Sequence, residues 1–153
     1  FNISQLEYSH GGGRYFAGAA FHNRQFPIDE EGEMASAEDS RRHTTCAWWI
    51  YGEQTVWTAA DRSIACMAQY SENTSHDNGC CRYAEVGCAY TDSSNECGLS
   101  AQYARFNQGT ERSVELTWRR QINKTIALQP SFQYVNNDNG DFAVLCARMS
   151  VSF

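Results

Sequence analysis

Seven polar residues in the sequence combine hydrogen-bond donors and acceptors that suit an uncharged, hydroxyl-rich ligand. They are Glu53, Glu115, Thr117, Arg119, Gln129, Gln133 and Arg148. Arginine offers a rigid fork of N–H donors, a carboxylate accepts, and an amide does both. Aromatic faces at Trp49, Tyr51 and Trp57 could cover the C–H surfaces of such a ligand. The alternatives are generic solvation for the charged groups and, for the aromatic groups, a girdle at a lipid interface.

Alternation of apolar and polar residues at period two would position these groups on one face of a sheet. The pattern is clearest in the last third of the chain. The apolar positions there are Val114, Leu116, Trp118, Ile126, Leu128, Phe132, Tyr134, Leu145, Met149 and Val151. Such alternation is typical of strands with one apolar and one polar face. Template matching along the chain predicts about nine strands, each near the ~9–11 residues that cross a bilayer at a tilt. Between Cys46 and Trp57 both faces carry aromatic residues, so the orientation of that strand is ambiguous.

The predicted connections give a second, independent signal. They are 10–13, 25–44, 58–62, 73–81, 91–96, 107–111, 122–124 and 136–140. Transmembrane barrels have short periplasmic turns and longer outer loops, and the two longest connections fall at the same end of the predicted sheet. The turn at 122–124 suggests that Thr117 lies opposite Gln129. The loop at 136–140 suggests that Gln129 lies opposite Arg148.

Length, charge and cysteine content narrow the class of protein. The chain has 153 residues, which suits one domain, and a net charge of −6, which disfavours a nucleic-acid partner. No apolar run approaches the ~20 residues of a membrane helix, so a membrane location would require a barrel. The seven cysteines are expected to act as small apolar residues, with a disulfide framework or a metal site as alternatives. We expect no cofactor, no metal and no catalytic residue.

Three segments near the end of the chain resemble the C-terminus of the carbohydrate-selective porins of the OprB family. They are 111–118, 126–135 with its Leu-Gln-Pro-x-x-Gln-Tyr element, and 147–153, which ends in Phe. Further upstream, Tyr51-Gly52-Glu53-Gln54 looks like an aromatic-x-Glu/Asp-Gln strand of that family. The resemblance implies an all-β, antiparallel transmembrane barrel of sixteen strands, to which residues 1–153 contribute the C-terminal part of a single domain. An odd count of nine strands fits this, with a miscounted strand as the alternative.

The same resemblance implies passive diffusion of small sugars across the bacterial outer membrane, with the seven polar residues lining the pore. Small sugars and outer-membrane lipid are then the expected partners, and assembly into a homo-oligomer is left open. Three alternatives remain: a general porin, an enzyme built on an outer-membrane barrel, and a secreted sugar-binding β-sandwich. No Gly-x-Ser-x-Gly element supports an enzyme.

Overall fold

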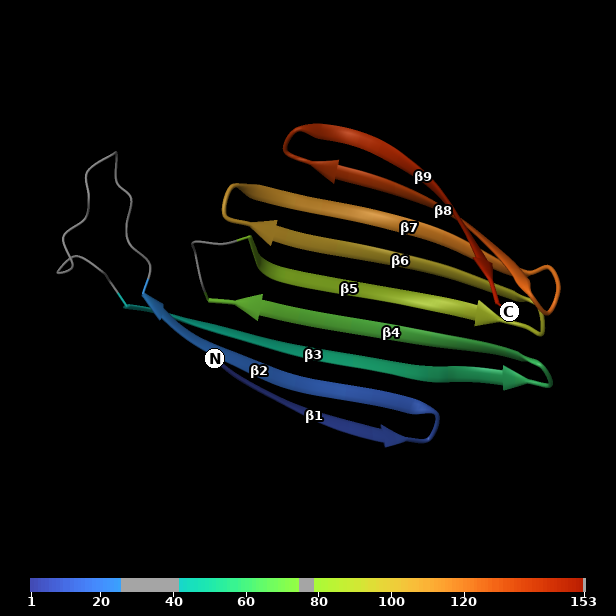
Figure 1. Ribbon diagram of the computed structural model, residues 1–153, viewed down its shortest axis with the longest axis horizontal. Helices are drawn as coiled ribbons and strands as arrows, with labels where there is room; N and C mark the ends of the chain where they lie inside the picture. Colours follow the sequence, from blue (N-terminus) through green and yellow to red (C-terminus); the bar gives the residue numbers. More distant parts are fainter. Residues whose placement is uncertain (26–41, 75–78, 153) are drawn as a thin grey trace.

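The computed structural model describes residues 1–25, 42–74 and 79–152, and these form one antiparallel sheet (Figure 1). Most of the predicted connection at 25–44 lies outside the described residues. Each strand pairs with the next along the chain, in the order β1 to β9. The strands are β1 (Asn2–His10), β2 (Gly13–Gln25), β3 (Arg42–Ala59), β4 (Arg62–Asn73), β5 (Cys80–Thr91), β6 (Asn95–Phe106), β7 (Gly109–Gln121), β8 (Ile126–Asn137) and β9 (Gly140–Val151). The prediction of nine strands is therefore confirmed, and no helix in the described ranges is long and apolar enough to cross a membrane.

Hairpin connections join the strands at two opposite ends of the sheet. The β1–β2 connection is only Gly11 and Gly12, both with positive φ, as a type I′ turn requires. The connections at 60–61, 92–94 and 122–125 lie at the same end and are also short. The two longest connections, 26–41 and 74–79, lie at the opposite end, which we call the long-loop end. In transmembrane barrels the longer loops lie at the outer end.

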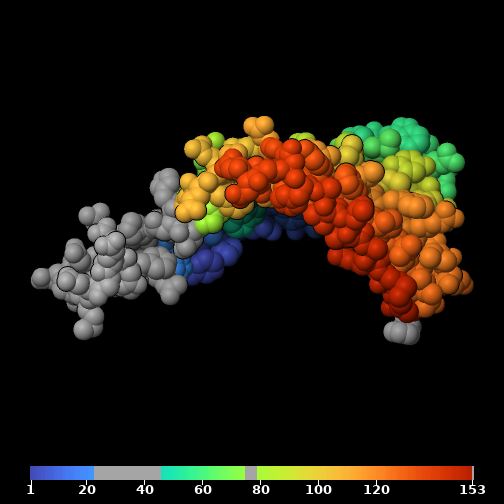
Figure 2. Space-filling model, turned by 90° about the horizontal axis from the view of Figure 1, so that it is seen from above, coloured from blue at the N-terminus to red at the C-terminus, as the bar shows by residue number. Residues whose placement is uncertain are grey.

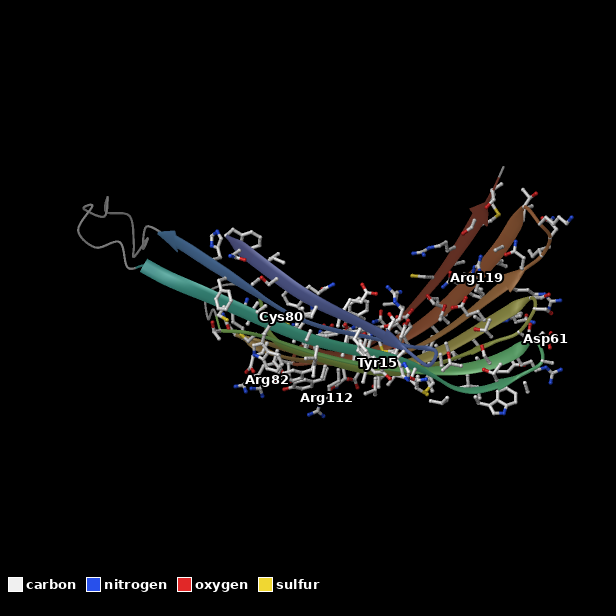
Figure 3. The ribbon with its side chains drawn as sticks, turned by 90° about the horizontal axis from the view of Figure 1, so that it is seen from below. Tyr15, Asp61, Cys80, Arg82, Arg112 and Arg119 are labelled. Atoms are coloured by element: carbon white, nitrogen blue, oxygen red, sulfur yellow. A yellow bond between two sulfur atoms is a disulfide. The ribbon has the colours of Figure 1, made fainter. Side chains whose placement is uncertain are left out.

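The sheet curves strongly, so that it has a concave and a convex face (Figure 2). Figure 3 shows Arg82 and Arg112 projecting from the convex face, while Arg119 lies on the concave side. Following the register from these positions puts Leu116, Phe132 and their apolar neighbours on the convex face and the polar partners on the concave face.

Large apolar side chains lie on the outside of this sheet instead of in a core. Leu116 is 53% exposed and Leu145 is 81% exposed, both on the convex face. Apart from Gly13, the buried residues of the described ranges, Ser113, Ala127 and Val135, belong to the concave face. Because a soluble β-sandwich would cover its apolar face with a second sheet, this single layer argues against the sandwich alternative.

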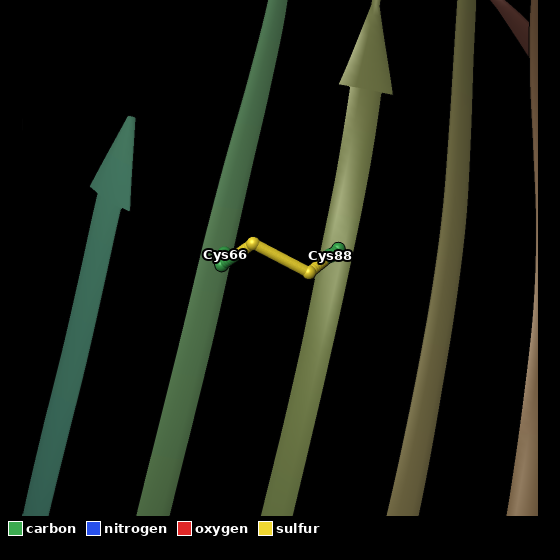
Figure 4. The surroundings of a disulfide bond; sticks show 2 residues. All are labelled: Cys66 and Cys88. Carbon is green, nitrogen blue, oxygen red and sulfur yellow. A yellow bond between two sulfur atoms is a disulfide. The ribbon is translucent and has the colours of Figure 1, made fainter. Parts of the chain in front are cut away.

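Two of the seven cysteines form a disulfide bond across β4 and β5 (Figure 4). Cys66 and Cys88 lie directly opposite each other on the convex face. The expectation that the cysteines act only as small apolar residues is therefore wrong for this pair. The other five, Cys46, Cys80, Cys81, Cys97 and Cys146, are free thiols.

Candidate functional site on the concave face

Polar side chains form two transverse rows across the middle of the concave face. The antiparallel register places residues from neighbouring strands side by side, and directly opposed residues share a face. The first row contains Arg14, Glu53, Ser100, Glu115 and Gln133. The second row contains Glu7, Tyr51, Gln69, Glu85, Gln102 and Ser113. The concave face therefore carries a belt of donors and acceptors near the middle height of the sheet.

Glu85 is the centre of a hydrogen-bonded network that spans four strands. Its carboxylate accepts from Gln69 Nε2 at 2.6 Å, from the Tyr83 hydroxyl at 2.8 Å and from Gln102 Nε2 at 3.3 Å. Ser113 Oγ then donates to Gln102 Oε1 at 3.1 Å. No basic side chain among the described residues lies within ion-pair distance of Glu85. The network orients the amide groups and leaves a negative charge on the wall of the concave face.

A second cluster, on β1, β2 and β3, combines charges of both signs with aromatic rings. Arg14 forms an ion pair with Glu7 at 3.2 Å, and its guanidinium lies 5.2 Å from the centre of the Phe16 ring. Phe16 contacts Tyr51, with 5.4 Å between ring centres. The Tyr51 hydroxyl donates to Glu53 at 2.5 Å. This cluster offers a ring face next to hydrogen-bonding groups, which is the combination that a sugar needs.

The indole of Trp49 lies flat against the concave wall above Gly18. A Cβ atom on Gly18 would stand only 2.3 Å from Trp49 Cζ2, so any side chain at position 18 would displace the ring. The indole N–H donates to Gln5 Oε1 at 3.1 Å, which fixes the ring from the opposite edge. The face of the ring is therefore held in place and directed toward the concave space.

The three aromatic residues considered in the sequence do not share one face. Trp49 and Tyr51 are concave, because they pair with Ser71 and Gln69. The register shifts by one residue between Thr55 and Trp57, where Trp57 pairs with Ile64 of the convex face. A β-bulge thus turns Trp57 outward. This position fits the alternative role of the aromatic residues, a girdle at a lipid interface.

All seven predicted polar residues lie on the concave face, but not in one row. Glu53, Glu115 and Gln133 belong to the first transverse row, and Thr117 lies two residues further along β7. Arg119, Gln129 and Arg148 lie nearer the end with the short turns. Whether these residues line a pore or contact a sugar stays a prediction.

The predicted pairing is confirmed for one of the two cross-strand contacts. Gln129 lies opposite Arg148. Thr117 lies opposite Ser131, so the predicted pairing of Thr117 with Gln129 is wrong by two residues. The side chains of Thr117 and Gln129 still meet diagonally, because Gln129 Nε2 donates to Thr117 Oγ1 at 3.1 Å. On the other side Arg119 lies 3.9 Å from Glu96.

Several residues of the belt are not among those predicted from the sequence. They are Glu7, Arg14, Gln69, Glu85 and Gln102. The alternation rule already put Gln69, Glu85 and Gln102 on the polar face of their strands. It did not show that they meet at one carboxylate, because that depends on the register of two hairpins. For β1 the alternation is weak, and Arg14 lies next to a turn.

No curated protein sequence matches the chain. Among solved structures, the fold is similar to OmpT (in-vitro folded), an outer membrane protein of Vibrio cholerae, with a TM-score of 0.46 and 10% sequence identity. That match covers 95% of this chain and 51% of the other, so the chain spans about half the length of that structure. The family model of the carbohydrate-selective porins matches residues 5–153. The chain therefore belongs to the OprB family of carbohydrate-selective porins, which are channels of the bacterial outer membrane and not enzymes.

Proposed function

We propose that the concave face forms part of the wall of a water-filled pore through which small sugars cross the outer membrane by passive diffusion. The observation that carries this proposal is the fixed belt around Glu85, Gln102 and Tyr51, next to the flat indole of Trp49. Hydroxyl groups of a sugar exchange water for the amides and carboxylates, while its C–H face contacts the rings. Because no step requires a bond to break, such a wall selects by fit and hydrogen bonding alone.

The seven predicted polar residues are proposed as pore-lining groups, with the network around Glu85 added to them. Acidic groups at Glu53, Glu85 and Glu115 lie near mid-height, and Arg119 and Arg148 lie nearer the short-turn end. Charges of opposite sign at different heights create a field along the pore axis. Such a field exerts no net force on a sugar without net charge, whereas it acts in opposite directions on cations and anions.

We further propose that residues 1–153 form the C-terminal part of one larger barrel. In the described sheet β1 and β9 each have a strand on one side only. An unpaired strand edge in lipid leaves N–H and C=O groups without partners, at a cost of several kcal/mol for each. Additional strands that join β1 to β9 would remove both edges and enclose the concave face.

Two tryptophans of β3 provide a matched test of sugar contact. In single-channel recordings of the full-length porin, Trp49→Ala should weaken sugar block of the ion current, while Trp57→Ala should not. If a sugar covers about 50 Å² of the indole, the loss is roughly 1.2 kcal/mol, or about an eightfold weaker block. Equal effects of the two substitutions would contradict the proposal, since Trp57 lies on the convex face.

A charge-removing variant tests the belt itself. Glu85→Gln keeps the size of the side chain and should lower the preference for cations over anions. Glu72→Gln is the control, because Glu72 lies on the convex face near the long-loop end. An unchanged ion preference in Glu85→Gln would mean that Glu85 does not face the narrow part of the pore.

A further inference from the structure

Three arginines cluster on the convex face near the long-loop end. Arg82 of β5 lies directly opposite Arg105 of β6. Arg112 of β7 lies opposite Tyr103 and is therefore the diagonal neighbour of Arg105. Figure 3 shows Arg82 and Arg112 projecting away from the concave face. We call Arg82, Arg105 and Arg112 the arginine patch.

The arginine patch lacks enough acidic partners among the described residues. Glu72 forms an ion pair with Arg82 at 2.9 Å, and the Nε atom of Arg82 is inaccessible to solvent without a hydrogen-bond partner. Arg105 and Arg112 make no ion pair or side-chain hydrogen bond within the described ranges. Because like charges on neighbouring strands repel each other, an anion bound between these arginines would stabilise the patch.

An apolar groove begins beside the arginine patch and runs over the convex face. Its volume is about 470 Å³, and its walls include Tyr103, Tyr134 and Arg112. The small side chains of Ala84 and Ala101 form part of its floor. A groove with a cation at its rim and apolar walls matches an amphiphile with an anionic head and a hydrocarbon chain.

The position of the arginine patch along the strands indicates in which leaflet of the membrane the amphiphile would lie. Arg105 and Arg112 lie within three residues of the ends of β6 and β7, beside the 107–108 turn. This is the long-loop end, which faces outward in a transmembrane barrel. At the opposite end of the convex face, Arg62 and Arg120 stand on β4 and β7, with two strands between them. In the described sheet, arginines of the convex face therefore lie on adjacent strands at the long-loop end but not at the short-turn end.

We propose that the arginine patch binds the phosphate groups of a phosphorylated lipid of the outer leaflet, and that an acyl chain of this lipid occupies the groove. Arg105 and Arg112 supply charge-assisted hydrogen bonds to phosphate oxygens, in the planar geometry that suits this anion. Arg82 stays bonded to Glu72 through Nη2 and adds positive charge at the edge of the site.

Native mass spectrometry of the full-length porin in non-ionic detergent tests this proposal. The probe is bis-phosphorylated lipid A, compared with the same lipid after removal of both phosphates and with inorganic phosphate alone. The double variant Arg105→Gln/Arg112→Gln should bind lipid A at least roughly tenfold more weakly than the wild type, because it loses hydrogen bonds between charged groups. Arg62→Gln/Arg120→Gln is the matched control and should bind like the wild type.

A second variant separates the acyl chain from the phosphate. Ala101→Phe fills the groove but keeps all three arginines, so it should weaken lipid A binding and leave the folded state intact. Equal binding of the dephosphorylated lipid would overturn the proposal, as would an equal loss in the control double variant. Retention of inorganic phosphate as tightly as lipid A would exclude a lipid. A change of oligomer size in Arg105→Gln/Arg112→Gln, with lipid binding unchanged, would assign the patch to a protein contact instead.

Discussion

Arginine substitutions at three depths of the convex face should cost different amounts of stability. Leu116 lies five residues before the end of β7, Leu128 two residues after the start of β8, and Val151 is the last residue of β9. With a rise of ~3.3 Å and a tilt of ~40°, each residue adds about 2.5 Å of height. Leu116 then lies about 13 Å from the strand end, at the middle of an apolar band ~25 Å tall.

Leu116→Arg should therefore destabilise the barrel by ~2–4 kcal/mol, the cost of this residue at the bilayer midplane. That is roughly a 30- to 900-fold change in the folding equilibrium. Val151→Arg should cost ~0–1 kcal/mol, as at an interface, and Leu128→Arg should fall between the two. Reversible unfolding of the full-length porin from lipid vesicles measures all three free energies.

Thr117→Arg is the control, since Thr117 is adjacent to Leu116 but lies on the concave face. Its side chain meets water, so the unfolding free energy should stay within about 1 kcal/mol of the wild type. Equal costs at Leu116 and Val151, or at Leu116 and Thr117, would refute the assignment of the convex face to lipid.

Two further predictions concern the wall and a turn. Gly18→Val should displace the Trp49 ring, because a Cβ would lie 2.3 Å from it. In a variant whose other three tryptophans are replaced by Phe, the fluorescence of Trp49 should then shift to the red, and an unchanged spectrum would contradict the packing. In the β5–β6 turn, the backbone N–H of Ser94, then the side chain and backbone N–H of Asn95, hold the pKa of Asp92 below its ordinary value. Its contribution to stability is thus present above about pH 4 and lost as the pH falls through the lowered pKa. Asp92→Asn should flatten the pH dependence of unfolding in this acid range, and an unaltered slope would show that the turn carries no such contribution.

The sequence predicted the faces of β7, β8 and β9 correctly but misplaced one register. Side chains in a strand alternate between the two faces of the sheet. If the centre of a turn moves by one whole residue, each residue acquires a partner two positions away, and that partner lies on the same face. The predicted turn was centred at 123, whereas Gln121 pairs with Ala127 and centres it at 124. Asn123 accepts hydrogen bonds from the N–H groups of Thr125 and Ile126, both at 2.8 Å, which extends the turn. A one-residue shift of the centre moves each partner by two residues and keeps the face.

The outward orientation of Trp57 and the hydrogen-bonded network around Glu85 could not be predicted from the alternation of apolar and polar residues. The bulge that turns Trp57 outward falls in a strand with aromatic residues on both faces, so no change of polarity marks it. Glu85 meets Gln69 and Gln102 only because β4, β5 and β6 align these residues across two hairpins. Long-range register of this kind depends on turn geometry, which the residue pattern of each strand does not contain.

The direction of curvature follows from side-chain size as well as from polarity. The side chains of the concave face converge, and small residues recur there, as at Gly87 and Gly98. A Cβ on Gly98 would meet Thr117 Cγ2 at 3.0 Å, and one on Gly87 would meet Ser100 Cβ at 3.2 Å. On the convex face the adjacent position Leu99 is 55% exposed and has room for its full side chain. If the sheet curved the other way, Leu99, Leu116 and Phe132 would be crowded together and the small residues would be spread apart. The same alternation therefore determines which face is apolar and which way the sheet must bend to enclose the polar face.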